Sequence, residues 1–163
     1  MIDQAGQEAA IAAAVAAWPE GVRREEGIDM PVLIVQAPLI RPVCEELKRR
    51  GFDMLTDLTA VDWLPMGKVP RFEVVYHLFS TRGMWRVRLK APVGEEDPVI
   101  DSLVPVWPGA NWPEREVWDL FGIRFEGHPN LTRIMMPDDW EGFPLRKDYP
   151  LEGTERPAPI VRE

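Results

Sequence analysis

The back third of the chain, from Glu114 to Leu151, mixes aromatic, acidic, basic, glycine and proline residues so densely that no helix or strand period accounts for it. A surface helix or strand needs only one apolar face, with a period of about 3.6 or 2 residues. Here aromatic and charged side chains alternate throughout, which is typical of a surface that another protein covers. We therefore expect a single domain, with a folded core in residues 1–126 and an extended partner-docking segment in residues 127–163.

The size and charge of the chain limit its class. With 163 residues and 45% hydrophobic content, it can bury one ordinary core. A formal net charge of −8 argues against a binder of nucleic acid or anionic membranes, because either needs a concentrated basic face. No apolar run approaches the roughly 20 residues that cross a bilayer, and the alanine-rich start lacks the basic region of a signal peptide. We expect a protein that is made and kept in the cytoplasm.

A single cysteine, Cys44, excludes an internal disulfide framework. One thiolate cannot supply the ligands of a typical iron–sulfur cluster or structural zinc site. We therefore expect that the chain carries no electrons itself. Cys44 lies in a predicted helix, where we interpret it as a small buried apolar residue.

The first half of the core predicts two helices and two strands. Alanine-rich residues 5–17 favour a helix, and the apolar, mostly β-branched residues 32–35 favour a strand. Residues 39–50 carry Pro42 in the first turn, apolar positions on one side and Gly51 beyond the end, as expected of an amphipathic helix. The charged residues 20–29 indicate a loop and residues 52–63 an imperfect strand, where Asp57 and Asp62 are interpreted as strand-edge or turn carboxylates.

The second half of the core predicts a hairpin and a capped helix. Apolar residues alternate along 72–78 and again along 85–89, and a short link joins these segments into an antiparallel pair. Asp97 and Pro98 indicate a brief helix that ends before Pro105. Residues 112–121 then predict a helix that Asn111 caps and Gly122 terminates, with Val117, Leu120 and Phe121 on its apolar side. The expected fold is α+β, a two-layer domain with a mixed, mostly antiparallel sheet and helices packed on it.

Prolines dominate the end of the chain. Pro144, Pro150, Pro157 and Pro159 prevent residues 143–163 from burying their backbone in a helix or a central strand. We expect this segment to leave the core, with Phe143 to Leu151 ordered on a partner and Glu155 to Glu163 disordered.

The stretch from Glu114 to Leu151 resembles the C subunit of the proton-pumping NADH-quinone oxidoreductase, respiratory complex I. That family has an E-R-E-x-x-D-L-F-G-I helix, then G-H-P, then P-L-R-K-D-Y-P. These motifs stand here at Glu114–Ile123, Gly127–Pro129 and Pro144–Pro150. Two positions differ from the pattern: Thr132 replaces a usual basic residue and Phe143 a frequent histidine.

The resemblance implies a non-catalytic subunit of the peripheral arm, on the cytoplasmic side of the cell membrane. In the family, other subunits carry FMN and the iron–sulfur clusters, so no cofactor is expected in this chain, which also lacks a G-x-G-x-x-G turn. The implied partners are the quinone-site subunit and the terminal-cluster subunit. The resemblance assigns these residues to the partner interface: Glu114, Arg115, Glu116, Asp119, Gly127, His128, Arg133, Pro144, Arg146, Lys147, Asp148, Tyr149 and Pro150.

Two alternatives remain at this point. The chain could be the equivalent subunit of a related membrane-bound hydrogenase or of a ferredoxin- or F420-linked dehydrogenase, which resemble this family. It could also be a small metal-dependent hydrolase that uses Glu116, Asp119 and His128, with Asp138 or Asp139 as the base. The hydrolase hypothesis is weaker, because H-E-x-x-H is absent and the two histidines are isolated.

Overall fold

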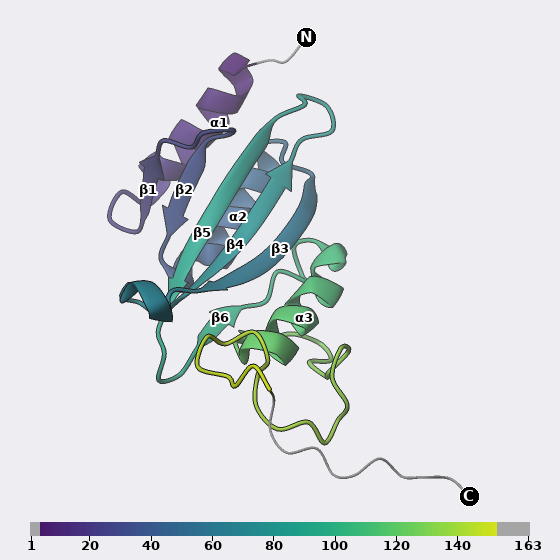
Figure 1. Cartoon of the computed structure of the whole chain (residues 1–163). Helices are drawn as coiled ribbons and strands as arrows, with labels where there is room; N and C mark the ends of the chain where they lie inside the picture. The colour runs from purple at the N-terminus through teal and green to yellow at the C-terminus, as the bar shows by residue number, and fades with distance from the viewer. Residues whose placement is uncertain (1–3, 153–163) are drawn as a thin grey trace, which may run out of the picture.

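A five-stranded mixed sheet with the strand order β1-β2-β5-β4-β3 forms the centre of the molecule (Figure 1). Its strands in the computed structural model, which describes residues 4–152, are β1 Val22–Glu25, β2 Val32–Val35, β3 Met54–Asp62, β4 Phe72–Phe79 and β5 Arg86–Val93. The β2–β5 pair is parallel and the other pairs are antiparallel. The disorder predicted for Glu155 to Glu163 lies outside the described residues.

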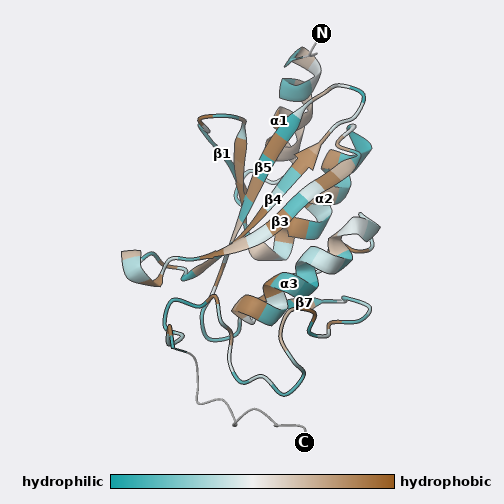
Figure 2. Ribbon diagram, turned by 45° about the vertical axis from the view of Figure 1, so that its right-hand side comes forward, coloured by the Kyte–Doolittle hydropathy of each residue, from teal (hydrophilic) through white to brown (hydrophobic). Residues whose placement is uncertain are grey.

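The predicted hairpin is confirmed by the pairing of β4 with β5, in which Phe72 lies opposite Val93 and Tyr76 opposite Leu89. Side chains alternate across a strand, so every second residue faces the core. Figure 2 shows apolar and polar residues alternating along these strands. The core-facing residues of β4 are fully buried: Phe72, Val74, Tyr76 and Leu78.

Helices cover one face of the sheet and one end of it. The helices α1 (Gln4–Ala17) and α2 (Ile40–Arg49) lie behind the sheet in Figure 1, and α3 (Asn111–Phe121) packs against β3. As predicted for residues 39–50, Val43 and Leu47 are buried. Short 3-10 turns occupy Ala37–Leu39, Leu64–Met66 and Pro108–Ala110.

Two predicted elements are wrong. Part of the expected loop 20–29 is the edge strand β1, whose outward Arg23 and Arg24 concealed it. The helix expected from Pro98 is instead the strand β6 (Val99–Asp101), which pairs in parallel with β7 (Arg124–Glu126). Asp97 and Pro98 resemble a helix start, but the partner strand is distant in sequence and decides the backbone conformation.

The predicted fold class is confirmed, since helices pack on a mixed and mostly antiparallel sheet. Cys44 is fully buried, as expected, and burial, followed by the charges of Glu45 and Glu114, raises the pKa of its thiol. Within residues 4–152 no helix has both the length and the apolar character needed to cross a membrane.

Candidate partner interface

The helix α3 supports the back third of the chain. Its apolar side, Val117, Leu120 and Phe121, is buried as predicted. Gly122 ends the helix in the left-handed region at φ 73°, and its N–H donates to the carbonyl of Trp118 over 2.8 Å. A residue with no Cβ adopts this conformation without strain. The chain therefore turns sharply at Gly122 and returns along α3.

The predicted N-cap at Asn111 is wrong. The turn Pro108–Ala110 precedes α3, so Asn111 already has helical torsion angles of φ −50° and ψ −54°. The cap residue is Ala110, and no side chain caps the helix. An N-cap residue needs a non-helical backbone to direct its oxygen at the first N–H groups, and the preceding turn removes that geometry.

Glu114, the first acidic residue of α3, is fully buried within the chain. Its Oε1 accepts the N–H of Leu103 over 2.6 Å, and its Oε2 accepts the hydroxyl of Ser102, also over 2.6 Å. Burial raises the pKa of Glu114 to about 7, although these hydrogen bonds and the charge of Arg41 act in the opposite direction. Glu114 thus ties α3 to the segment after β6.

Asp119, also expected at the partner interface, has a fully buried side chain. Its Oδ2 accepts the backbone N–H groups of Ile134, Met135 and Met136 over 3.0, 2.8 and 3.0 Å. Burial opposes its ionisation, but these three donors and Arg133 outweigh burial and lower the pKa of Asp119. Asp119 therefore fixes the backbone of residues 134–136 on α3.

Two arginines hold the neighbouring residues. Arg133 Nη1 lies 2.5 Å from Asp119 Oδ1, and its Nη2 donates to the carbonyl of Trp140 over 3.0 Å. Arg115 donates to the carbonyl of Thr132 over 3.0 Å and to its hydroxyl over 2.8 Å. These two predicted interface arginines therefore bind the chain itself. We call residues 127–152 the strap, because they cross α3 and are pinned to it.

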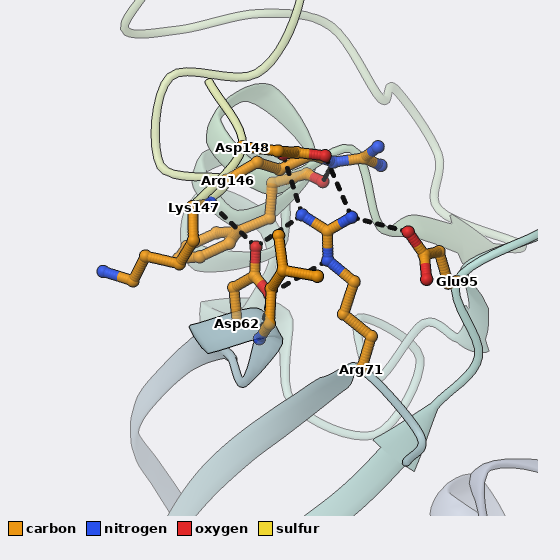
Figure 3. Close-up of polar contacts among 8 residues, drawn as sticks. Asp62, Arg71, Glu95, Arg146, Lys147 and Asp148 are labelled. Carbon is orange, nitrogen blue, oxygen red and sulfur yellow. Dashed lines mark hydrogen bonds and ion pairs between the residues drawn. The ribbon is translucent and has the colours of Figure 1, made fainter. Parts of the chain in front are cut away.

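A buried ion pair lies beside the second half of the strap. Arg71 Nε donates to Asp62 Oδ1 over 3.0 Å and its Nη2 to Asp62 Oδ2 over 2.7 Å, with side-chain exposures of 5% and 0% (Figure 3). The same guanidinium contacts the more exposed Asp148 over 2.8 and 3.0 Å and Glu95 over 2.7 Å. We call Asp62, Arg71, Glu95 and Asp148 the ion cluster.

Backbone contacts fasten the strap beside the ion cluster. The N–H of Lys147 donates to Asp62 Oδ2 over 2.8 Å, and the N–H of Leu145 donates to the carbonyl of Leu120 over 3.0 Å. Arg146 Nε donates to the carbonyl of Phe121 over 2.6 Å. Burial opposes the ionisation of Asp62, but Arg71 and the N–H groups of Lys147 and Leu64 lower its pKa to about 2.

Aromatic rings fill the space between the strap and α3. The Arg146 guanidinium lies 4.6 Å from the centre of the Phe143 ring and 5.1 Å from that of Phe72. An added Cβ at Gly122 would lie 2.5 Å from Phe143 and 2.7 Å from Arg146. The strap therefore packs closely at a position where only glycine fits.

The expectation that the C-terminal segment leaves the core is wrong for the described residues. The strap has no helix or strand, as predicted, but it folds back onto α3 and the ion cluster. The physical reason is that buried carboxylates, Asp62 and Asp119, satisfy backbone N–H groups that an extended segment would leave to water.

The predicted interface residues differ in exposure. The buried ones are Glu114 and Asp119. The half-buried ones are Arg115, His128, Arg133, Pro144, Arg146 and Tyr149. The exposed ones are Glu116, Gly127, Lys147, Asp148 and Pro150. The buried carboxylates serve the fold of this chain, so the exposed residues are those best placed to meet a partner.

Sequence reasoning missed the ion pair between Asp62 and Arg71. The sequence pattern indicates only a strand-edge or turn carboxylate at Asp62 and gives no role to Arg71. Asp62 ends β3 and lies opposite Phe72 in the antiparallel pair, so Arg71 stands next to it. Opposite charges at the adjoining ends of two predicted strands are the signal that could have revealed this pair.

The hydrolase hypothesis gains no support from the geometry. Asp119 is occupied by the strap, and the ring nitrogens of His128 lie 3.2 Å from the Asn111 carbonyl and 3.0 Å from the Asn130 nitrogen. Within the described part of the chain, no three or more His, Cys, Asp or Glu side chains gather where they could hold a metal ion.

Two solved structures have a similar fold. The trypsin-resistant fragment (1-134) of Nqo5 is 33% identical, with a TM-score of 0.69 over 77% of this chain and 99% of that one. A chain of the membrane-bound sulfane sulfur reductase, an archaeal respiratory membrane complex, is 25% identical, with a TM-score of 0.75 over 89% and 86%.

Sequence comparison extends this similarity. The NADH-quinone oxidoreductase C subunit from Geotalea uraniireducens is 53% identical over 125 residues, which is 76% of this chain and 75% of that protein. Its counterpart from Moorella thermoacetica is 48% identical over 128 residues, 78% and 84% of the two chains. Residues 33–155 match the family described as respiratory-chain NADH dehydrogenase, 30 Kd subunit. The chain therefore belongs to this family, the C subunit of the peripheral arm of NADH-quinone oxidoreductase.

Proposed function

We propose that the chain is a positioning subunit without catalytic activity or a cofactor of its own. It braces the quinone-site subunit and the terminal-cluster subunit on the cytoplasmic side of the membrane. Electrons from NADH then pass through FMN and iron–sulfur clusters on other subunits to the quinone. The relatives support the assignment to this enzyme, because they are named as its C subunit.

The observation that carries the bracing role is that the strap is fixed at both halves. Asp119 holds residues 134–136, and Asp62 holds Lys147. A segment that is ordered before it meets its partner loses little conformational entropy on binding. The strap therefore presents its outward side chains in one arrangement.

Lys147 offers a test that leaves the fold intact. Its backbone N–H binds Asp62, but its side chain is exposed and points away from the ion cluster (Figure 3). Within residues 4–152 its ammonium group forms no hydrogen bond or ion pair. We expect Lys147→Glu to weaken assembly at least tenfold without changing the melting temperature of the isolated chain.

The experiment measures the subunits that co-purify with a tagged chain from its own cells. A second variant, Lys147→Ala, separates the loss of the positive charge from its reversal. Lys68→Glu is not a suitable control, because Lys68 pairs with Glu73. We expect Arg146→Ala and Asp148→Ala to weaken assembly without unfolding the isolated chain, but both also remove strap anchors and therefore do not isolate the partner contact. Unchanged recovery of the quinone-site and terminal-cluster subunits with Lys147→Glu and Lys147→Ala would contradict the bracing role.

A second candidate is the equivalent subunit of a related membrane-bound hydrogenase or of a ferredoxin- or F420-linked dehydrogenase. The similarity to a chain of the membrane-bound sulfane sulfur reductase favours it, since that structure covers 89% of this chain. The same purification separates the candidates. NADH oxidation by the co-purified assembly supports the first, and an assembly without NADH-oxidising subunits supports the second.

A further inference from the structure

The loop between β3 and β4, residues 63–70, exposes three apolar side chains. Leu64 is 41% exposed, Met66 76% and Val69 90%. Single apolar residues are common on protein surfaces, whereas several in one short loop mark a contact site. Two prolines, Pro65 and Pro70, add to the apolar surface.

The loop carries one charge, and that charge is already neutralised. Lys68 Nζ lies 2.8 Å from Glu73 Oε2 and 4.5 Å from the centre of the Trp63 ring. Lys68 is therefore paired within the chain, and apolar side chains make up most of the remaining outward surface of the loop. A basic or acidic surface, or anionic lipid headgroups, would gain little from it. The complementary surface is an uncharged apolar recess.

Hydrogen bonds hold the first half of the loop, residues 63–66. The N–H of Leu64 donates to Asp62 Oδ1 over 3.0 Å, and the N–H of Trp63 donates to the carbonyl of Arg71 over 2.9 Å. The N–H of Met66 closes a turn by donating to the carbonyl of Trp63 over 2.9 Å. A loop that is ordered in advance inserts at a small entropic cost.

The loop and the strap share the same anchor. Asp62 Oδ1 accepts the N–H of Leu64 in the loop. Asp62 Oδ2 accepts the N–H of Lys147 in the strap (Figure 3). The strap places Leu145, which is 46% exposed, two residues from this contact. A partner that covers the strap beside the ion cluster therefore also meets the loop.

We propose that residues 63–70 form an apolar knob that inserts into an uncharged recess of the same neighbouring subunit that covers the strap. This inference rests on the proposed function, because it extends the docking surface of the strap. Met66 and Val69 are its principal contacts, because they are the most exposed of the three. Asp62 holds the knob next to the strap, because it accepts an N–H group from each.

Photo-crosslinking in the assembled enzyme tests this placement. A photoreactive phenylalanine analogue replaces Met66, Leu145 or Ile28 in turn. Ile28 is the control because it is 107% exposed and lies before β2, whereas the knob lies before β4. The strands β2 and β4 run in opposite directions, so their starts lie at opposite ends of the sheet. We expect positions 66 and 145 to crosslink to one neighbouring subunit and position 28 not to crosslink to it.

Charge insertion provides an independent measurement. Met66→Asp and Val69→Asp place a charge in the recess, so we expect at least a tenfold loss of that neighbouring subunit from the purified enzyme. Ile28→Asp should leave its recovery unchanged. All three positions are exposed, so the melting temperatures of the isolated chains should agree with the wild type within a few degrees.

The outcomes separate this inference from the proposed function. If Lys147→Glu reduces assembly and Met66→Asp does not, the knob is refuted and the bracing role stands. If neither reduces assembly, both are refuted. A wild-type chain that forms a dimer in solution, which Met66→Asp dissociates, would show that a second copy fills the role of the recess and would overturn the proposal.

Discussion

Asp62 and Arg71 form a two-pronged ion pair inside the protein, with Oδ1–Nε and Oδ2–Nη2 distances of 3.0 and 2.7 Å. Both side chains are almost inaccessible to solvent. The pair joins the ends of β3 and β4 and receives the strap through Lys147. Its geometry makes Asp62 the point at which sheet, loop and strap meet.

Replacing Arg71 with methionine should cost about 3–5 kcal/mol of unfolding free energy, because it leaves a buried carboxylate without its counter-charge. Urea denaturation measures the loss. The control is Asp148→Ala, which removes a 51% exposed partner of the same guanidinium and should cost less than about 1 kcal/mol. Equal losses in the two variants would show that burial of Asp62 does not matter.

Asp119→Asn should release the strap from α3. The amide keeps one acceptor oxygen, but its NH2 group cannot replace the oxygen that faces Arg133 or the backbone N–H groups. We expect a loss of about 3 kcal/mol and faster tryptic cleavage after Arg133, which precedes the residues that Asp119 holds. Glu116→Gln makes the same chemical change at an exposed position of α3 and should alter neither result. A strap that stays resistant to trypsin in Asp119→Asn would argue against this anchor.

Gly122→Ala tests the close contact between the strap and α3. The new Cβ would combine a left-handed backbone with contacts of 2.5 Å to Phe143 and 2.7 Å to Arg146. Gly67→Ala is the matched control, because its φ is 60° but a Cβ there meets nothing within 4 Å. The control should lose about 1–2 kcal/mol from backbone strain alone. Gly122→Ala should lose more unfolding free energy than the control, as measured by thermal unfolding. An equal loss would mean that Phe143 and Arg146 move aside without an energetic cost.

The pH dependence of stability should report Glu114. Its folded pKa of about 7 lies above its ordinary value of 4.5, so the native state binds more protons than the unfolded state between these values. The unfolding free energy therefore falls as pH rises through this window, by on the order of 3 kcal/mol, and levels off above it. Glu114→Gln mimics the protonated form and should remove this slope. A slope that persists in the variant would assign it to other groups.

The sequence was sufficient to predict those elements that depend on residues close together in the chain. The alternation along β4 and β5 predicted the hairpin, and Gly122 predicted the end of α3. Burial of Val117 on α3 followed from helical spacing. Each of these features depends on residues that are neighbours in the chain, so the sequence contains the necessary information.

Features that depend on distant residues could not be predicted. The fold of the strap depends on Asp62 and Asp119, whose carboxylates accept backbone N–H groups from distant parts of the chain. The residues around Asp62 and Asp119 in the sequence do not indicate these contacts. The strand β6 exists only because β7 pairs with it. The resemblance to the family identified the importance of the motif E-R-E-x-x-D, whereas only the structure revealed that Glu114 and Asp119 point inward. Whether the exposed motif residues contact the quinone-site and terminal-cluster subunits stays a prediction.

The parallel pairing of β2 with β5 has a consequence for synthesis on the ribosome. β5 lies between β2 and β4 in the sheet, but β2 leaves the ribosome well before β5. Until the later strand emerges, the inner flank of β2 offers unsatisfied amide and carbonyl groups to any nascent chain nearby. Truncated products that stop ahead of Arg86 should consequently aggregate, which makes the amino-terminal half unsuitable as a separately expressed fragment.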